Sequence, residues 1–255
     1  MGIDFTAAQN ANSYSGRQAH DSWVQAIRSV IDPLGKKVVD LGCGGGIYSR
    51  EWLAIGARSV IGVDSSAPIL EAAGRDTDDA RASFLLGDAS ATGLPGGLAD
   101  IVFSRALVHH LEDLTAFAQE AVRLVRPGGS IIIQDRTMDD VAQPADPRHL
   151  RGYFFELFPR LFEVERTRRP EETEMAEALQ VAANAEVDVR RLWEVRTMHE
   201  SRQHVLADIG ARKGRSILHD LDGDELEALV GHIAGRLPDG HIWEMDSWTL
   251  WIAHV

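Results

Sequence analysis

The stretch VVDLGCGGG, residues 38–46, decides the fold of this chain. An apolar run carries Asp40 near its end and is followed by glycines at positions 42, 44, 45 and 46. This order is typical of a buried strand, a sharp turn and the start of a helix, because glycine permits backbone conformations that tight turns need. Open α/β sheets bind ligands at the carboxyl ends of their strands. The stretch therefore predicts a ligand site on an α/β sheet.

The residues around this stretch alternate between short apolar runs and segments of helical periodicity, such as the one over 114–125 with Asp113 as its N-cap. This alternation predicts βαβ units and a mostly parallel sheet flanked by helices. Strands are expected over residues 37–41, 59–64, 83–86, 100–104 and 130–134, with two more over 192–199 and 247–255.

The 255 residues are expected to form a single domain. We predict a core over 35–135, an N-terminal helical segment over 1–34, a helical insertion over the active site at about 136–191, and C-terminal strands and helices over 192–255.

The predicted insertion contains an aromatic segment and a charged one. The segment from Tyr153 to Phe162 has three interpretations, namely a lid over an apolar acceptor, a helix that packs in the core, or a dimer contact. The charged stretch EVERTRRPEETE, residues 163–174, is expected to be solvated.

Composition narrows the classes of partner. The chain has 26 Lys and Arg residues against 39 Asp and Glu, which gives a formal net charge of -13. A negatively charged protein surface repels a phosphate backbone, so we expect no nucleic-acid partner. No apolar run approaches a membrane span, and the first residues lack a signal-peptide pattern, which together predict a cytoplasmic protein that does not bind membranes. The single cysteine, Cys43, allows no internal disulfide, and the ten histidines show no metal-ligand spacing, so no metal is expected.

Acidic residues follow the first three predicted strands. Asp64 lies 22 residues beyond Gly42, where a carboxylate can accept hydrogen bonds from both hydroxyls of a ribose, and Asp88 could accept one from an exocyclic amine such as that of adenine. A single Asp at the end of a strand is as often a helix cap as a ligand contact. Three such residues after three successive strands, at one edge of the sheet, indicate a binding site. Because Asp40 would repel a pyrophosphate, and Ile47 stands where a dinucleotide fingerprint needs glycine, the ligand is expected to be cationic or zwitterionic.

Five segments together resemble the class I S-adenosylmethionine-dependent methyltransferases, in the branch related to ubiquinone/menaquinone C-methyltransferases. They are VVDLGCGGG, IGVDSS, LLGDAS, ADIVFSRALVHHLED and RLVRPGGSIIIQD, and the resemblance covers residues 35–135. It implies a Rossmann-like sheet of seven strands with an antiparallel last strand, S-adenosylmethionine as the cofactor, and direct in-line methyl transfer to a small molecule. Such transfer needs mainly positioning, which can supply about 7 to 11 kcal/mol.

The resemblance also implies roles for single residues. Asp40 would lie near the cofactor's ammonium group, Asp64 would hold its ribose, and Arg105 would border its sulfur through the backbone. The other cofactor contacts that it implies are Gly42, Cys43 and Gly44 at the methionine part, Ser65, Asp88 and Ala89 at adenine, and Tyr14, which would fold over the cofactor. Cys43 is interpreted as a small buried side chain and not as a catalytic thiol.

Two adjacent histidines, His109 and His110, follow the fourth predicted strand. Imidazole titrates near neutral pH, so either histidine could act as a base. We predict His110 as the catalytic base, with His109 as the second candidate, while a role in shaping the pocket and capping the next helix is the alternative. His199 is a further possible base. The aromatic segment favours an apolar or aromatic acceptor. Whether oxygen, nitrogen or carbon is methylated stays open, as does the oligomeric state, monomer or homodimer.

Two other functions stay open. A nicotinamide (NAD)-dependent oxidoreductase would share the sheet and an acid after the second strand, although Ile47 and Asp40 argue against it. A non-catalytic relative that keeps the cofactor pocket for regulation is the second alternative.

Overall fold

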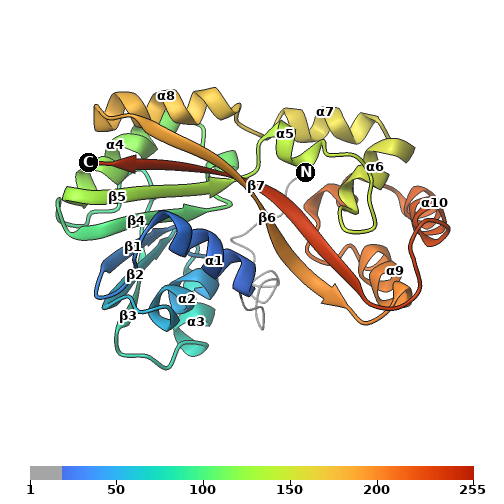
Figure 1. The fold of residues 1–255 in the computed structure, drawn as a ribbon, viewed down its shortest axis with the longest axis horizontal. Coiled ribbons are helices and arrows are strands. Elements are labelled where there is room, and N and C mark those ends of the chain that lie inside the picture. The colour runs from blue at the N-terminus through green and yellow to red at the C-terminus, as the bar shows by residue number, and fades with distance from the viewer. Residues whose placement is uncertain (1–18) are drawn as a thin grey trace. The chain divides into compact units, whose positions relative to one another are not determined.

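The computed structural model describes residues 19–255 and contains one seven-stranded sheet in the order β3-β2-β1-β4-β5-β7-β6 (Figure 1). Strands β1 to β5 pair in parallel, and β7 pairs with β5 in the antiparallel direction. The strands are β1 (Lys37–Leu41), β2 (Ser59–Asp64), β3 (Ala82–Leu86), β4 (Ala99–Arg105), β5 (Val125–Asp135), β6 (Val187–His199) and β7 (Ile242–His254). The predicted fold class and all seven predicted strands are confirmed.

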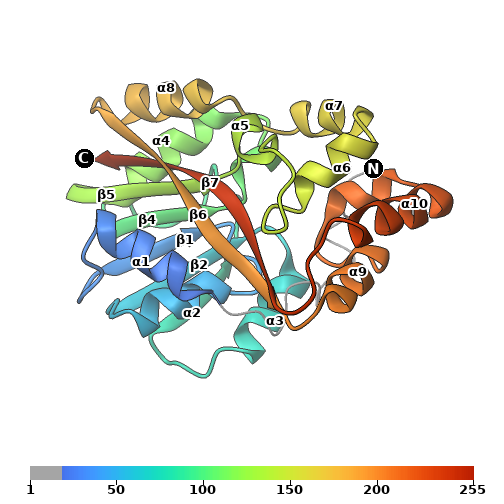
Figure 2. The same cartoon turned by 45° about the vertical axis from the view of Figure 1, so that its right-hand side comes forward.

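Alternating side chains of the buried strands supply two hydrophobic cores, one on each face of the sheet, because successive side chains of a strand point to opposite faces. Val38 and Ile132 pack with Trp23 of α1 (Asp21–Val30) and Trp52 of α2 (Ile47–Ala54). Their neighbours in the strands, such as Val39, pack with α4 (Leu114–Leu124) and α8 (Glu172–Ala183). Figure 2 shows α4 and α8 side by side on one face.

Local signals explain where the helices begin. The Asp113 carboxylate accepts a hydrogen bond from the Ala116 N–H at 2.9 Å, which confirms the predicted N-cap of α4. Helix α3 (Ala67–Arg75) follows Ser66 and has Pro68 in its first turn.

The described chain divides into two compact units. The sheet unit contains the chain up to Asp135 with Pro170–Leu192 and Thr249–Val255, and the second unit contains Arg136–Arg169 and Trp193–Trp248. Strands β6 and β7 run through both. The second unit holds α5 (Met138–Val141), α6 (Arg151–Leu157), α7 (Arg160–Arg166), α9 (Arg202–Gly210) and α10 (Gly223–Ala234). The boundaries of the two units differ from the predicted ranges, because the second unit takes residues from both the predicted insertion, 136–191, and the predicted C-terminal part, 192–255.

The second unit has its own core, in which Tyr153 and Phe154 of α6 pack against α9 and α10. Of the three interpretations of the aromatic segment, packing in a core is therefore the one that applies to Tyr153 and Phe154. The expectation that the charged stretch 163–174 is solvated was wrong in part, because Glu165 is 2% exposed and lies between Arg151 and Arg169. Helix α8 lies within the range predicted to be a helical insertion, 136–191, although no separate helix was predicted over its residues. No helix among residues 19–255 is both long enough and apolar enough to cross a membrane.

Candidate active site

The glycine turn after β1 lies where the chain order of the sheet reverses. Strand β1 has β2 on one side and β4 on the other, and open α/β sheets bind ligands at the carboxyl ends of the strands at such a point. Gly42 has φ +70°, and a Cβ added to it would lie 2.8 Å from Cδ1 of Leu107, in the loop after β4. The turn therefore needs glycine here for its conformation and for close packing.

The next glycines leave open space beside the backbone. Gly44 has φ +52°, and an added Cβ would meet no atom within 4 Å at either Gly44 or Gly45. Gly46, with φ +71°, is the N-cap of α2. The turn thus presents bare backbone, to which a ligand can approach closely.

Asp64, at the end of β2, fastens the turn to the next loop. Its Oδ2 accepts a hydrogen bond from the Gly44 N–H and its Oδ1 accepts one from the Ser66 N–H, both at 2.9 Å. A carboxylate offers about four lone-pair sites, so each oxygen keeps capacity for a further donor. Asp64 is partly exposed and can reach a ligand.

Asp40 is buried beneath the same turn. The Ser49 hydroxyl of α2 donates to its Oδ2 at 2.5 Å. Burial, reinforced by the nearby Asp64 carboxylate and opposed by the Ser49 hydrogen bond, raises the pKa of Asp40 to about 7. A cationic ligand beside it would favour the charged form.

The other predicted contacts on the first three strands differ in exposure. Ser65 and Asp88 are exposed, whereas Ala89 is buried in the core. The Asp88 carboxylate accepts the Ser90 N–H at 2.7 Å and so shapes its own loop. Cys43 is buried, and burial raises the pKa of its thiol well above the usual value, which fits a packing residue.

The residues after β4 follow the strand that pairs with the other side of β1. The Arg105 guanidinium lies over the Tyr48 ring of α2, with its Cζ 4.3 Å from the ring centroid. Ala106 has φ +54°, a strained conformation for a residue with a Cβ. The predicted contact Tyr14 lies outside the described residues.

The two histidines after β4 occupy different environments. His109 is nearly buried, and its Nδ1 lies 2.9 Å from both carboxylate oxygens of Asp135, the last residue of β5. Asp135 also accepts the His109 backbone N–H at 3.3 Å. His110 is exposed, and its ring centroid lies 3.9 Å from that of His109. The Asp135 carboxylate thus orients the ring of His109.

Two residues of this site, Asp135 and Ser49, were not predicted from the sequence. Asp135 could have been found by the same signal as Asp64, an acid that ends a buried strand, whereas Ser49 shows no signal of its own. His199 belongs to the second unit, where its Nε2 lies 2.9 Å from Glu244 Oε2. Within residues 19–255, no group of three or more His, Cys, Asp or Glu side chains is arranged to hold a metal ion.

Comparison with known proteins agrees with this geometry. Residues 39–133 match the methyltransferase domain family. Over 114 residues, the chain is 37% identical to malonyl-[acyl-carrier protein] O-methyltransferase of Yersinia pestis, a match that covers 43% of this chain and 41% of that protein. The chain therefore spans less than half the length of this relative.

Two solved structures share the fold. A protein assigned as a methyltransferase of an antibiotic biosynthesis pathway in Anabaena variabilis superposes with a TM-score of 0.68 at 19% identity, over 89% of this chain and 95% of that one. Phosphoethanolamine N-methyltransferase 2 of Haemonchus contortus, solved with S-adenosyl-L-methionine, gives 0.61 at 18% identity, over 99% of this chain and 60% of that one. Residues 39–133 therefore match the methyltransferase domain family, and the described chain shares its fold with these two solved structures.

Proposed function

We propose that this protein is an enzyme that transfers the methyl group of S-adenosylmethionine to a small molecule, which the sequence predicts to be apolar or aromatic. The observation that carries the proposal is the Asp64 carboxylate, which holds the glycine turn through Gly44 and keeps lone pairs for a ligand at the point where the strand order reverses.

The residues at this edge of the sheet fit the proposed cofactor. The bare backbone at Gly44 and Gly45 leaves space for its methionine part, and the Asp64 carboxylate suits ribose hydroxyls. Asp40, Asp64 and Asp88 make the edge acidic, which favours a cation over a diphosphate. The same acidity argues against a nicotinamide dinucleotide. We retain Ser65, Asp88 and Ala89 as proposed adenine contacts, with Cys43 and the backbone of Arg105 nearer the methionine and sulfur.

When bound, S-adenosylmethionine supplies a methyl group on a sulfonium that a nucleophile displaces in line. The new bond forms from the acceptor atom to the methyl carbon as the carbon–sulfur bond breaks, and sulfur keeps the electron pair. The chain must then align the acceptor, exclude water and, where the acceptor carries a proton, take it up.

We propose that an imidazole after β4 accepts this proton. His110 is the base predicted from the sequence. His109 is a second candidate, because the Asp135 carboxylate favours the tautomer with the proton on Nδ1 and so leaves Nε2 to accept one.

The variants His110→Ala, His109→Ala and Asp135→Asn separate the two candidates. If His110 is the base, His110→Ala lowers kcat at least about 100-fold and Asp135→Asn changes it little. A large loss in both His109→Ala and Asp135→Asn, with a change in the pH profile of kcat, would assign the role to His109.

The experiment that tests the proposed function is consumption of labelled S-adenosylmethionine in a cell extract with the purified protein. Transfer of the label to a small molecule supports an enzyme. Binding of S-adenosylhomocysteine without transfer to any compound of the extract would favour the non-catalytic regulatory alternative.

A further inference from the structure

Strand β3 lies at one edge of the sheet, beside β2. The Arg81 carbonyl, just before β3, accepts a backbone hydrogen bond from β2 at 3.0 Å, and the Gly87 N–H, just after β3, donates one to β2 at 3.0 Å. Alternate residues of a strand turn their backbone groups to the same neighbour. Phe84 and Leu86 therefore turn their N–H and C=O groups away from β2, towards the edge of the sheet.

This edge strand lacks the features that usually prevent pairing with another chain. Its sequence, ASFLL, contains neither a charged residue nor a proline. Leu85 is 38% exposed and Leu86 is 58% exposed. Edge strands of native proteins are commonly protected by charges, by proline or by a covering segment, and an exposed apolar edge strand is a ready template for a further strand.

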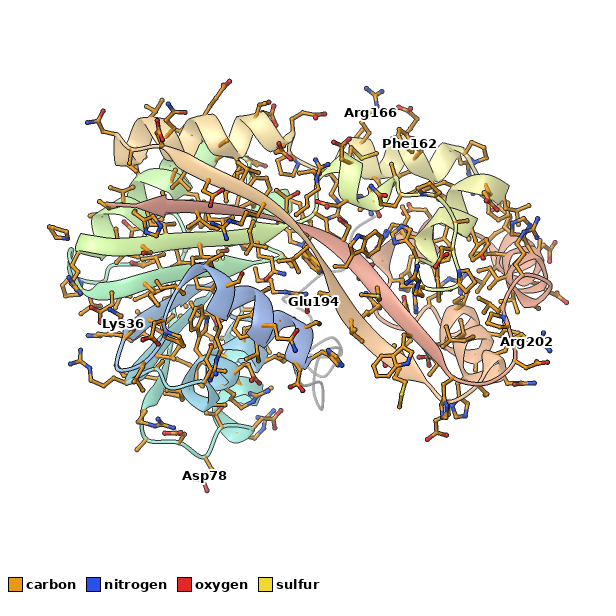
Figure 3. All side chains as sticks on the ribbon, viewed as in Figure 1. Lys36, Asp78, Phe162, Arg166, Glu194 and Arg202 are labelled. Carbon is orange, nitrogen blue, oxygen red and sulfur yellow. The ribbon has the colours of Figure 1, made fainter. Side chains whose placement is uncertain are left out.

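A groove of about 450 Å³ lies between β3 and helix α3 in the same unit. Its lining includes Phe84 and Leu86 of β3 and Glu71 and Gly74 of α3. A Cβ added to Gly74 would meet no atom within 4 Å, so this side of α3 is open. The turn that joins α3 to β3 lies at the margin of the unit, where the Asp78 side chain points outward (Figure 3).

We propose that β3 and α3 form the interface of a homodimer, in which the two β3 strands pair antiparallel about a twofold axis. Helix α3 packs on both β2 and β3. Neighbouring strands lie about 4.8 Å apart, so the axis would place the two α3 helices about two strand spacings, or about 10 Å, from each other. Packed helices lie at about this separation, and Gly74 adds no side chain between them.

Charges on α3 favour a second copy over an unrelated strand as the partner. Glu71 and Arg75 are exposed, lie one turn apart on the same side of α3, and form no ion pair with any residue of the range 19–255. A twofold axis makes the two helices antiparallel, so Glu71 of one copy comes opposite Arg75 of the other, and the reverse pair repeats the contact. The surface is therefore complementary to itself.

Sedimentation equilibrium of the full chain at 1 to 100 µM tests the proposal, and neither cofactor nor methyl acceptor is needed. We expect twice the mass of one chain at the highest concentration, with a Kd for dissociation of about 10 µM or lower. A wild type that stays monomeric at 100 µM would overturn the inference, and the edge would then be open to a different protein.

A lysine on the edge strand locates the interface. Leu86→Lys places a charge where the two strands pair, and it should weaken the dimer at least about tenfold. The matched control is Leu34→Lys, because Leu34 is a leucine of the same unit that is 72% exposed and lies outside β3 and α3. This control should leave the Kd for dissociation within twofold of wild type.

Reversal of the charges on α3 tests the twofold contact itself. Glu71→Arg and Arg75→Glu each bring like charges together across the axis, so either one alone should weaken the dimer at least about fivefold. The double variant Glu71→Arg/Arg75→Glu restores opposite charges and should recover a Kd within twofold of wild type. A double variant as weak as the single ones would refute the antiparallel contact of the helices.

A dimer that Leu86→Lys leaves as stable as wild type would show that another surface is used, and so would overturn the inference. If Leu86→Lys fails to fold, hydrogen exchange of the wild type gives the answer. The amides of Phe84 and Leu86, which face the edge, should exchange more slowly at 100 µM than at 1 µM, because they bond to the second copy. Equal exchange at both concentrations would contradict the pairing of β3.

Discussion

Removal of the Asp64 carboxylate is the perturbation whose effect follows most directly from the structure. Gly44 and Ser66 occupy one acceptor position on each carboxylate oxygen, and about one on each is left for a ribose hydroxyl. A hydrogen bond to a charged group contributes about 1.5 to 3 kcal/mol. Loss of two such bonds in Asp64→Ala is expected to cost about 3 to 6 kcal/mol of binding energy, which weakens the Kd for S-adenosylhomocysteine at least about 100-fold.

Calorimetry with S-adenosylhomocysteine measures this effect, with Asp79→Ala as the matched control. Asp79 is a carboxylate of the same unit that binds Arg81 on a surface loop, so its removal should leave the Kd unchanged. Asp64→Asn keeps one carbonyl oxygen as a neutral acceptor and should give an intermediate Kd.

A ligand without the 2′-hydroxyl distinguishes ribose contacts from an indirect effect on the turn. The wild type should bind 2′-deoxy-S-adenosylhomocysteine more weakly than S-adenosylhomocysteine, whereas Asp64→Ala should bind the two alike. A Kd within about threefold of wild type in a folded Asp64→Ala variant would refute the reasoning, because about 0.7 kcal/mol is less than one such hydrogen bond contributes.

Three further substitutions test other parts of the site. His110→Ala should lower kcat at least about 100-fold and leave the Kd for S-adenosylhomocysteine within twofold, and a kcat within twofold of wild type would make His110 structural. The pKa of Asp40 is about 7 in the folded protein and near 3.8 in the unfolded chain, so the folded state holds the proton more tightly. The stability that this protonation contributes is fully present below pH 3.8 and is lost as the pH rises towards 7. Urea unfolding should therefore show Asp40→Asn gaining more stability over wild type at pH 8 than at pH 5, by on the order of 2 to 3 kcal/mol, and an equal gain at both would contradict the raised pKa. Gly44→Ala and Gly93→Ala each add a Cβ at a positive φ where no other atom lies within 4 Å. Both variants should lose about 1 to 3 kcal/mol of folding free energy. Only Gly44→Ala should also weaken cofactor binding.

The sheet could be predicted from the sequence because its signals are local. The runs at 37–41 and 59–64 are short, apolar and rich in valine, and each ends before a glycine or a helix cap. Even β3, which lies at the edge of the sheet beside β2, was placed within one residue of its observed start. An acid at the end of such a strand follows from the same pattern, and this rule led to Asp64.

The second unit could not be predicted in the same way, because its stability depends on pairs of residues far apart in the chain. Arg136 and Asp246 lie 110 residues apart, and nothing near either one in the sequence indicates the other. Glu165 therefore read as one member of a solvated charged stretch, although its partners bury it. His109 is a similar case, since its partner Asp135 lies 26 residues away and only the pairing of β4 with β5 brings the two together.

A crystal structure of the protein with S-adenosylhomocysteine is the most direct test of the proposed cofactor site. The account predicts both ribose hydroxyls within about 2.6 to 3.2 Å of the Asp64 carboxylate oxygens, with the amino-acid part of the ligand against the backbone from Gly42 to Gly44. Crystals grown at saturating ligand that show this edge empty, or the ribose in contact with other residues and Asp64 with none, would contradict it.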